Sequence, residues 1–160
     1  MQGVINIGIS DLNVASPPGV LATYALGSCV GICLHDKTHN IGGLAHIMLP
    51  DSRESSNAAE NLRRYADTGL AELIDTMKRK GASVSCMTAK IAGGAQMFQT
   101  QLKTFNIGER NVAAVKKLLA DYRIRLIAED TGSNYGRTVF FDVATGIMQV
   151  KSVTKGVVNL

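Results

Sequence analysis

The stretch VLATYALGSCVGICLHDKTHNIGGLAHIML, residues 20–49, carries the pattern from which the rest of the fold follows. It holds two apolar runs on either side of the polar pentapeptide Asp36–Asn40. Asp and Asn favour turns because their side chains hydrogen-bond the local backbone. Apolar runs that flank such a turn indicate strands. The stretch therefore predicts a β-hairpin.

Hydrophobic periodicity indicates the elements on both sides of this hairpin. Further strands are expected at residues 4–9, 84–91, 124–128, 139–143 and 147–153, and helices at 57–80 and 109–122. Strands come first, then helix–strand–helix–strand, then a second hairpin. This order predicts an α/β (α+β) fold, a single layered domain of mixed β-sheets with packed helices. A length of 160 residues fits one domain spanning 1–160.

The longer helix is expected to begin at Asn57 and to end before Gly81. Asn57 with Glu60 three residues later is typical of a capping box, and cations followed by glycine are typical of a helix C-terminus. Its apolar stripe consists of Leu62, Tyr65, Ala66, Gly69, Leu70, Leu73, Ile74 and Met77. The inward residues of the second helix are expected to be Val112, Val115, Leu118, Leu119 and Tyr122.

Composition excludes several classes of protein. The chain is 46% apolar, and its three cysteines are too few and odd in number for a disulfide framework. No basic and apolar leader opens it and no 18 apolar residues run together, so a cytoplasmic protein without membrane insertion is expected. The net charge of +4 is mild and its basic residues are scattered, which argues against nucleic acid and favours acidic protein surfaces as partners.

The hairpin also concentrates residues able to do chemistry near neutral pH. If its turn centres between Lys37 and Thr38, Cys29 lies directly opposite His46. Directly opposite residues share a face, with Cβ atoms about 4.5–5.5 Å apart, whereas a slip of one residue would separate them. The pairing predicts a cysteine nucleophile with a histidine base. The alternative is that Cys29 is a small core residue.

A neighbouring imidazolium would help this thiol. A free thiol is only about 3% ionised at pH 7, and a positive charge beside it raises that share. Acyl transfer also needs backbone N–H donors for the oxyanion. Gly27 and Ser28 lie in the tight segment before Cys29 and are the candidates for this oxyanion loop.

Other clusters of reactive residues have weaker signatures. Cys33, His35, Asp36 and His39 are ligand types but match no strong zinc spacing, and both histidines are expected to be exposed beside the turn. Cys33 and Cys86 lie in expected strands, where core packing is the better interpretation. Neither a metal nor a cofactor is expected.

Three polar or glycine-rich segments keep more than one interpretation. Ala92–Phe98 lacks the lysine and hydroxyl of a P-loop, so close backbone packing is expected. Asn106–Asn111 begins a helix, and its polar side chains either cap that helix or face a partner. Glu129–Asn134 is a polar turn at a strand end, which is typical of a site-lining position but equally of an Asx turn.

Six motifs combine into a recognisable pattern. They are Leu26–Val30, Ala45–Pro50, Tyr65–Asp67, Lys90–Ala95, Asn106–Asn111 and Ala128–Gly132. Each is weak alone, but six in order at compatible spacing are specific. Together they resemble the CheD family, the chemoreceptor glutamine deamidases of bacterial and archaeal chemotaxis.

The resemblance implies a cysteine-dependent hydrolase that converts protein glutamine side chains to glutamate through a thioester. The family's nucleophile corresponds to Cys29 and its histidine to His46. A threonine six positions before the cysteine is the family's third catalytic residue, which corresponds to Thr23; the alternative is an ordinary strand residue. The resemblance also implies a layered fold like the catalytic domain of glutamine-deamidating bacterial toxins.

The resemblance further implies partners. The substrate would be the cytoplasmic helices of chemotaxis receptors, and a CheC-type phosphatase would bind the same surface, giving a monomer or a heterodimer with CheC. Met97, Phe98 and Ile107 are candidate apolar anchors, although each also suits the core. The rival hypothesis is a non-catalytic CheD-like adaptor, which the retained cysteine, histidine and threonine disfavour. A cysteine protease is disfavoured because 160 residues leave no room for a cleft between two domains.

Overall fold

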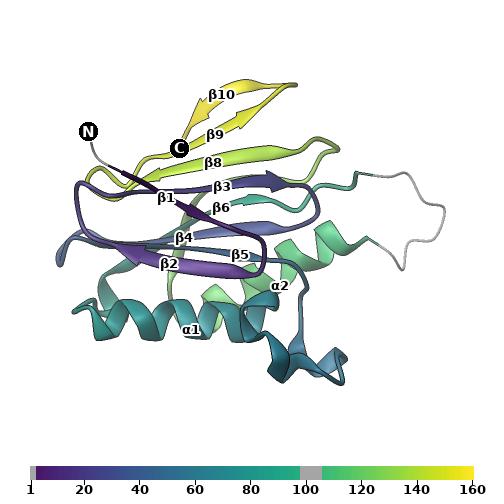
Figure 1. Ribbon diagram of the computed structural model, residues 1–160, viewed down its shortest axis with the longest axis horizontal. Helices are drawn as coiled ribbons and strands as arrows, with labels where there is room; N and C mark the ends of the chain where they lie inside the picture. The colour runs from purple at the N-terminus through teal and green to yellow at the C-terminus, as the bar shows by residue number, and fades with distance from the viewer. Residues whose placement is uncertain (1–2, 98–105) are drawn as a thin grey trace.

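Two five-stranded sheets and two helices form three layers in the computed structural model, which describes residues 3–97 and 106–160 (Figure 1). Sheet A contains, in spatial order, β1 (Val4–Ile7), β3 (Val20–Leu26), β8 (Arg137–Asp142), β9 (Met148–Ser152) and β10 (Gly156–Asn159). Sheet B contains β2 (Asp11–Ala15), β5 (Ile41–Ile47), β4 (Val30–Asp36), β6 (Met87–Gly93) and β7 (Arg125–Thr131). The helices are α1 (Ala66–Arg79) and α2 (Ile107–Asp121). Short 3-10 turns lie at Ser52–Glu54, Ala58–Glu60, Leu62–Arg64 and Val84–Cys86.

Sheet B is the middle layer, with sheet A on one face and both helices on the other (Figure 1). Its central strands β4 and β5 are buried on both faces, which explains why their sequence is apolar almost throughout. Parallel pairs (β1 with β3, β6 with β7) occur beside antiparallel ones, so both sheets are mixed. The predicted layered fold with mixed sheets and packed helices is confirmed.

The predicted hairpin is correct for residues 30–47 and wrong for residues 20–26. β4 and β5 pair around the turn, whereas β3 lies in the other sheet between β1 and β8. Ala25 has a left-handed φ of 57°, and the register between β3 and β8 shifts between Thr23 and Leu26. This irregularity ends β3, and Gly27–Cys29 then crosses from sheet A to sheet B.

The longer helix begins at Ala66, nine residues later than its sequence predicts. The preceding chain forms 3-10 turns, and the Asn57 side chain caps nothing. Tyr65 is extended, only 2% exposed, and bridges Leu49. Ala66 N donates to Leu49 O at 2.9 Å, so this segment is held against the chain leaving β5 and cannot wind into a helix.

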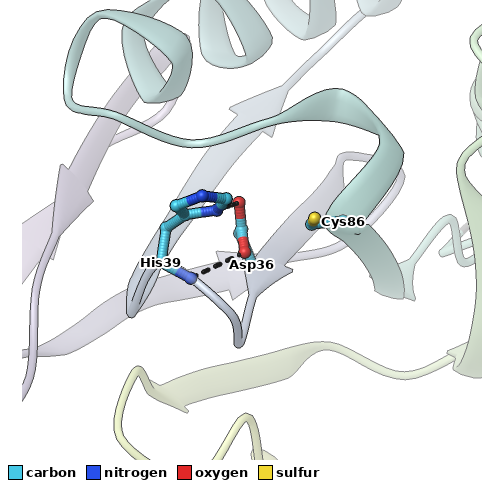
Figure 2. Close-up of side chains that lie close together, drawn as sticks. All are labelled: Asp36, His39 and Cys86. Atoms are coloured by element: carbon cyan, nitrogen blue, oxygen red, sulfur yellow. Dashed lines mark hydrogen bonds and ion pairs between the residues drawn. The ribbon is translucent and has the colours of Figure 1, made fainter.

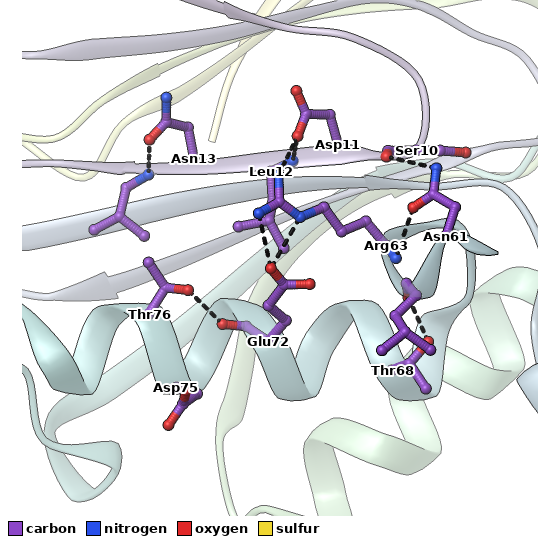
Figure 3. Close-up of polar contacts among 12 residues, drawn as sticks. Ser10, Asp11, Leu12, Asn13, Asn61, Arg63, Thr68, Glu72, Asp75 and Thr76 are labelled. Carbon is purple, nitrogen blue, oxygen red and sulfur yellow. Dashed lines mark hydrogen bonds and ion pairs between the residues drawn. The ribbon is translucent and has the colours of Figure 1, made fainter. Parts of the chain in front are cut away.

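Polar contacts fix the same segment against β2 and α1. Figure 3 shows Arg63 between Asp11 and Glu72, with Asn61 bonded to Ser10. The Arg63 guanidinium lies 2.6 Å from Asp11 Oδ1 and 2.8 Å from a Glu72 oxygen. The sequence pattern places Arg63 on a solvated helix face. It links three elements instead.

Smaller differences concern edges and caps. β2 and β10 are additional edge strands, and β1 ends at Ile7. Of the side chains expected inward on α2, Val115 and Leu119 are buried, Val112 and Leu118 are half-buried, and Tyr122 is 37% exposed. Strands β8 and β9 form the predicted second hairpin.

Candidate active site

Three segments bring the sequence-predicted site residues to one end of the inter-sheet core. Thr23 lies on β3 of sheet A, His46 on β5 of sheet B, and Cys29 at the end of the crossover between the sheets. All three are buried, with exposed fractions of 0%, 2% and 6%. Residues from both sheets therefore contribute to the site.

The register of the β4–β5 hairpin differs from the predicted one by two residues. Gly31, not Cys29, lies opposite His46, because Asp36 pairs with Ile41. A shift of two keeps each side chain on its original face, since side chains alternate with a period of two. Cys29 packs into the core between the sheets, and the His46 ring reaches β3 from the same side. The pairing is wrong, and the shared face is correct.

Thr23 fixes the tautomer of His46. Its Oγ1 lies 2.7 Å from Ile7 O and 2.7 Å from His46 Nδ1. A carbonyl oxygen can only accept, so the single hydroxyl proton goes to Ile7 O. The hydroxyl must then accept from His46 Nδ1–H. This leaves Nε2 with a free lone pair, and Nε2 is buried with no partner among the described residues.

The crossover loop is held by the chain that leaves β6. Gly94 N donates to Cys29 O at 2.8 Å and Ala95 N donates to Gly27 O at 2.9 Å. Gly93 has a φ of +112°, and a Cβ there would lie 2.2 Å from Cys29 O. The expected close backbone packing of this glycine segment is confirmed, and what it packs against is the loop that carries the cysteine.

Two N–H groups of the loop remain available to a ligand. Gly27 N donates to Ala25 O at 3.1 Å. Within residues 3–97 and 106–160, no acceptor on another residue takes the N–H of Ser28 or Cys29. The oxyanion loop expected at Gly27 and Ser28 therefore offers the N–H of Ser28 and of Cys29, while that of Gly27 is occupied.

Burial keeps both reactive groups neutral at rest. It lowers the pKa of His46 to about 4 and raises the pKa of the Cys29 thiol. The backbone N–H of Cys29 partly opposes the rise in the pKa of the thiol, because it favours the thiolate. The imidazolium expected beside the thiol is therefore absent from the resting pair. Proton transfer has to accompany attack, with His46 Nε2 as the acceptor.

Comparison with known proteins assigns the family. A family model described as CheD chemotactic sensory transduction matches residues 48–152. The chain belongs to the CheD family. It is 48% identical over 158 residues to the probable chemoreceptor glutamine deamidase CheD of Syntrophomonas wolfei, covering 98% of each chain. It is 46% identical over 150 residues to the chemoreceptor glutamine deamidase CheD of Thermotoga maritima, covering 94% of this chain and 92% of that one.

Solved structures share the fold at low identity. Neisseria meningitidis protein NMB0706, a DUF152 protein, matches with a TM-score of 0.54 at 12% identity, over 81% of this chain and 64% of that one. Bacillus licheniformis YfiH matches with a TM-score of 0.50 at 16% identity, over 76% and 50%. The chain thus spans less than two thirds of either protein. The likeness to toxin catalytic domains stays a prediction.

One of the three predicted apolar anchors, Met97, borders the crossover loop of this CheD-family chain. Met97 is 45% exposed, and a Cβ built on Gly27 would lie 3.2 Å from its Cγ. Ile107 is half-buried at the start of α2, and Phe98 lies outside the described residues. Within the described ranges, no helix is long and apolar enough to cross a lipid bilayer.

The polar turn after β7 lines a cavity of about 470 Å³ against α2. Thr131, Gly132 and Ser133 face Glu109 and Lys116 across it. Gly94, whose N–H holds Cys29 O, also lines this cavity. The turn therefore lines a cavity that contains none of Thr23, Cys29 and His46, and both of its predicted interpretations stay open.

A cluster of ligand types forms at the opposite end of β4, and it contains two of the four residues suspected from sequence, Asp36 and His39, together with Cys86. Ligand atoms of Asp36, His39 and Cys86 lie within 4.8 Å of one another (Figure 2). Asp36 already accepts from His39 N, from His39 Nδ1 and from Ser83 N, at 3.0, 2.7 and 2.9 Å. These bonds close the β4–β5 turn and account for the cluster without an ion.

Cys33 and His35, the other two suspected ligands, lie outside this cluster. Cys33 is 1% exposed in the inter-sheet core, which confirms its predicted packing role. Cys86 is half-buried in a 3-10 turn, so its expected place in a strand is wrong. His35 is not exposed as expected, because its Nε2 lies 2.8 Å from Val143 O. The His39 side chain is 41% exposed, as predicted.

Proposed function

We propose that this chain hydrolyses glutamine side chains of chemotaxis receptors to glutamate, with Cys29 as nucleophile and His46 as base. The names of its relatives supply the reaction and the substrate class. The observation that carries the proposal is the buried 2.7 Å contact between Thr23 Oγ1 and His46 Nδ1. It leaves Nε2 as a free base on the sheet face where Cys29 also lies.

The first half of the reaction forms a thioester. The Cys29 sulfur bonds to the carboxamide carbon while its proton passes to His46 Nε2. The carbonyl electron pair moves to oxygen, where the N–H groups of Ser28 and Cys29 stabilise it. The imidazolium then gives its proton to the nitrogen, the C–N bond breaks, and ammonia leaves.

The second half restores the enzyme. His46 Nε2 takes a proton from water, and the resulting hydroxide attacks the thioester carbon. The C–S bond breaks as the proton returns to sulfur, and the product is glutamate. The receptor gains one negative charge. Each step needs Nε2 as the site of proton exchange, which the Thr23 contact provides.

The partners follow from the same proposal. A receptor helix brings its own rigid backbone, so a shallow surface beside Met97 and Ile107 suffices to bind it. A CheC-type phosphatase would cover that surface, in a heterodimer with an otherwise monomeric chain in the cytoplasm. The proposal includes one domain spanning residues 1–160, which is supported by the contribution of both sheets to the site. A purely adaptor role would leave the Thr23–His46 contact without purpose.

Ammonia release from a receptor cytoplasmic fragment tests the proposal. Cys29→Ala and His46→Ala should each lower the rate by at least about 10³-fold, because nucleophile and base act as a unit. Cys33→Ala is the matched control, since Cys33 is buried in the same core but lies on β4. Undiminished ammonia release by folded Cys29→Ala would refute the mechanism, and an inactive Cys33→Ala would show that the loss is structural.

A further inference from the structure

Asn111 is a buried amide that joins the two segments carrying the reactive residues. It lies on α2 and is 0% exposed. Its Nδ2 donates to Ser28 O at 2.9 Å and to Met48 O at 3.0 Å. Ser28 directly precedes Cys29, and Met48 lies two residues after His46. One side chain therefore spans the crossover loop and the end of β5.

The orientation of this amide is determined by its neighbours. Both partners are carbonyl oxygens, which only accept, so the NH₂ group must face them. Asn111 Oδ1 is then left buried with no donor among the described residues. An unsatisfied buried acceptor lowers stability. An apolar side chain could fill this space without losing that stability. The two hydrogen bonds that Asn111 donates therefore indicate a role beyond packing.

The bond to Ser28 O sets the direction of the next N–H. In a trans peptide the C=O and the following N–H point in opposite directions. A Ser28 carbonyl held toward α2 therefore turns the Cys29 N–H away from α2. That N–H and the sulfur belong to the same residue, so the two lie close together. A tetrahedral oxyanion would form next to this sulfur.

We propose that Asn111 is a positioning residue that holds the Ser28–Cys29 peptide with the Cys29 N–H aimed at the oxyanion. The proposal rests on the thioester mechanism above. Ala95 N fixes the preceding peptide through Gly27 O in the same way. All three carbonyls of Gly27–Cys29 are thus held from outside the loop, and Asn111 is the side chain among the donors.

Two probes separate oxyanion positioning from a general loss of structure. A receptor peptide with glutamate γ-semialdehyde in place of the target glutamine forms a thiohemiacetal: the sulfur bonds to the aldehyde carbon and the thiol proton passes to the oxygen. The hydroxyl oxygen of this adduct takes the position of the oxyanion, where it accepts a hydrogen bond from the Cys29 N–H. Iodoacetamide alkylates the same sulfur by displacing iodide, with no oxyanion. Both probes are applied to wild type, Asn111→Ala and Asn111→Ser, together with kcat and KM for ammonia release.

The expected result is selective. Asn111→Ala should lower kcat and weaken aldehyde inhibition by about tenfold or more, since loss of an oxyanion donor costs about 10²–10³ in rate. KM and the alkylation rate of Cys29 should change less than about threefold. Asn111→Ser, which can donate one bond, should fall between wild type and Asn111→Ala, and it decides the question if Asn111→Ala does not fold.

Val115→Ala is the matched control on the same helix. Val115 is 0% exposed and packs in the core on the helix side of sheet B. It should lower the melting temperature without weakening aldehyde inhibition. Equal losses of alkylation and aldehyde inhibition in Asn111→Ala, or no loss of either, would overturn the positioning role. Ammonia release by Cys29→Ala would instead overturn the thioester mechanism, so the two failures are distinguishable.

Discussion

The Thr23 hydroxyl has a single proton, which it donates in a hydrogen bond to the Ile7 carbonyl oxygen. Thr23→Val keeps the shape of the side chain and removes the hydroxyl, so His46 loses the partner that selects its tautomer. We expect kcat to fall by about 10- to 100-fold, since a base in the wrong tautomer is severely impaired. Steady-state ammonia release measures this change.

Thr23→Ser is the control for that substitution, because it keeps the hydroxyl and removes only a methyl group. It should retain most of the activity. Equal losses in Thr23→Val and Thr23→Ser would show that packing at β3, rather than the hydrogen bond to Nδ1, determines the rate.

His46 should make the fold sensitive to mild acid. Its folded-state pKa of about 4 lies below the ordinary value of 6.5 because burial disfavours the charged ring. The unfolded chain therefore binds the proton first. The contribution of neutral His46 to the unfolding free energy is fully present above pH 6.5. It is lost as the pH falls from 6.5 to about 4, and the loss is roughly 3 kcal/mol.

Urea denaturation at pH 7 and at pH 4.5 tests this, with wild type compared to His46→Gln. Glutamine cannot titrate, so its unfolding free energy should fall less between the two pH values. Buried carboxylates with lowered pKa, such as Asp36, are present in both proteins and cancel in the comparison. A pH dependence that is the same in both would contradict the assignment.

The loop between β6 and α2 supports the crossover at the scale of elements. Gly93→Ala would force a Cβ to within 2.2 Å of Cys29 O at a left-handed φ of +112°. The mutant should lose more than about 2 kcal/mol of unfolding free energy through the collision and the backbone strain together. The same displacement should lower kcat, because it moves the backbone of the nucleophile.

Gly132→Ala separates the two costs. Its φ is +80°, yet a Cβ there would meet nothing within 4 Å. It should lose only the strain, about 1–2 kcal/mol, and keep its kcat. Thermal and urea denaturation of both variants give the difference. A Gly93→Ala protein as stable and as active as Gly132→Ala would rule out the predicted collision.

Local sequence predicted those elements whose boundaries depend on local signals. The β8–β9 hairpin and the end of α1 before Gly81 belong to this group. The start of α1 does not, because Tyr65 is held extended by pairing with Leu49, a contact between segments distant in sequence. The hairpin register was wrong by two for a different reason: composition locates a turn at Asp36–Asn40 but does not fix its centre, which lies one residue later than predicted.

The site shows the same division. Cys29 lies directly before β4 and His46 lies on β5, and motif and spacing predicted both as reactive residues although the predicted pairing was wrong. Thr23 required the family resemblance, since a threonine in a strand has no distinguishing pattern. Asn111 was noticed only as part of a polar helix entry. Its role depends on how α2 packs against sheet B, which no local pattern encodes.

The charge of the whole molecule should influence how it meets its substrate. The net charge is +4, and acidic receptor helices would be attracted to it. Raising the salt concentration from about 0.05 to 0.5 M should lower kcat/KM several-fold, because screening shortens the reach of surface charges. The kcat value should not change. A kcat/KM that is insensitive to salt would contradict a role for electrostatic attraction in substrate binding.

The crossover of Gly27–Cys29 from one sheet to the other has a consequence for the chain before it is fully folded. The base and its tautomer depend on β3 and β5, and these strands reach each other only when the two sheets dock. A nascent or partly unfolded chain therefore exposes a thiol but has no hydrolase. Docking of the two sheets is therefore the step that would assemble the proposed active site.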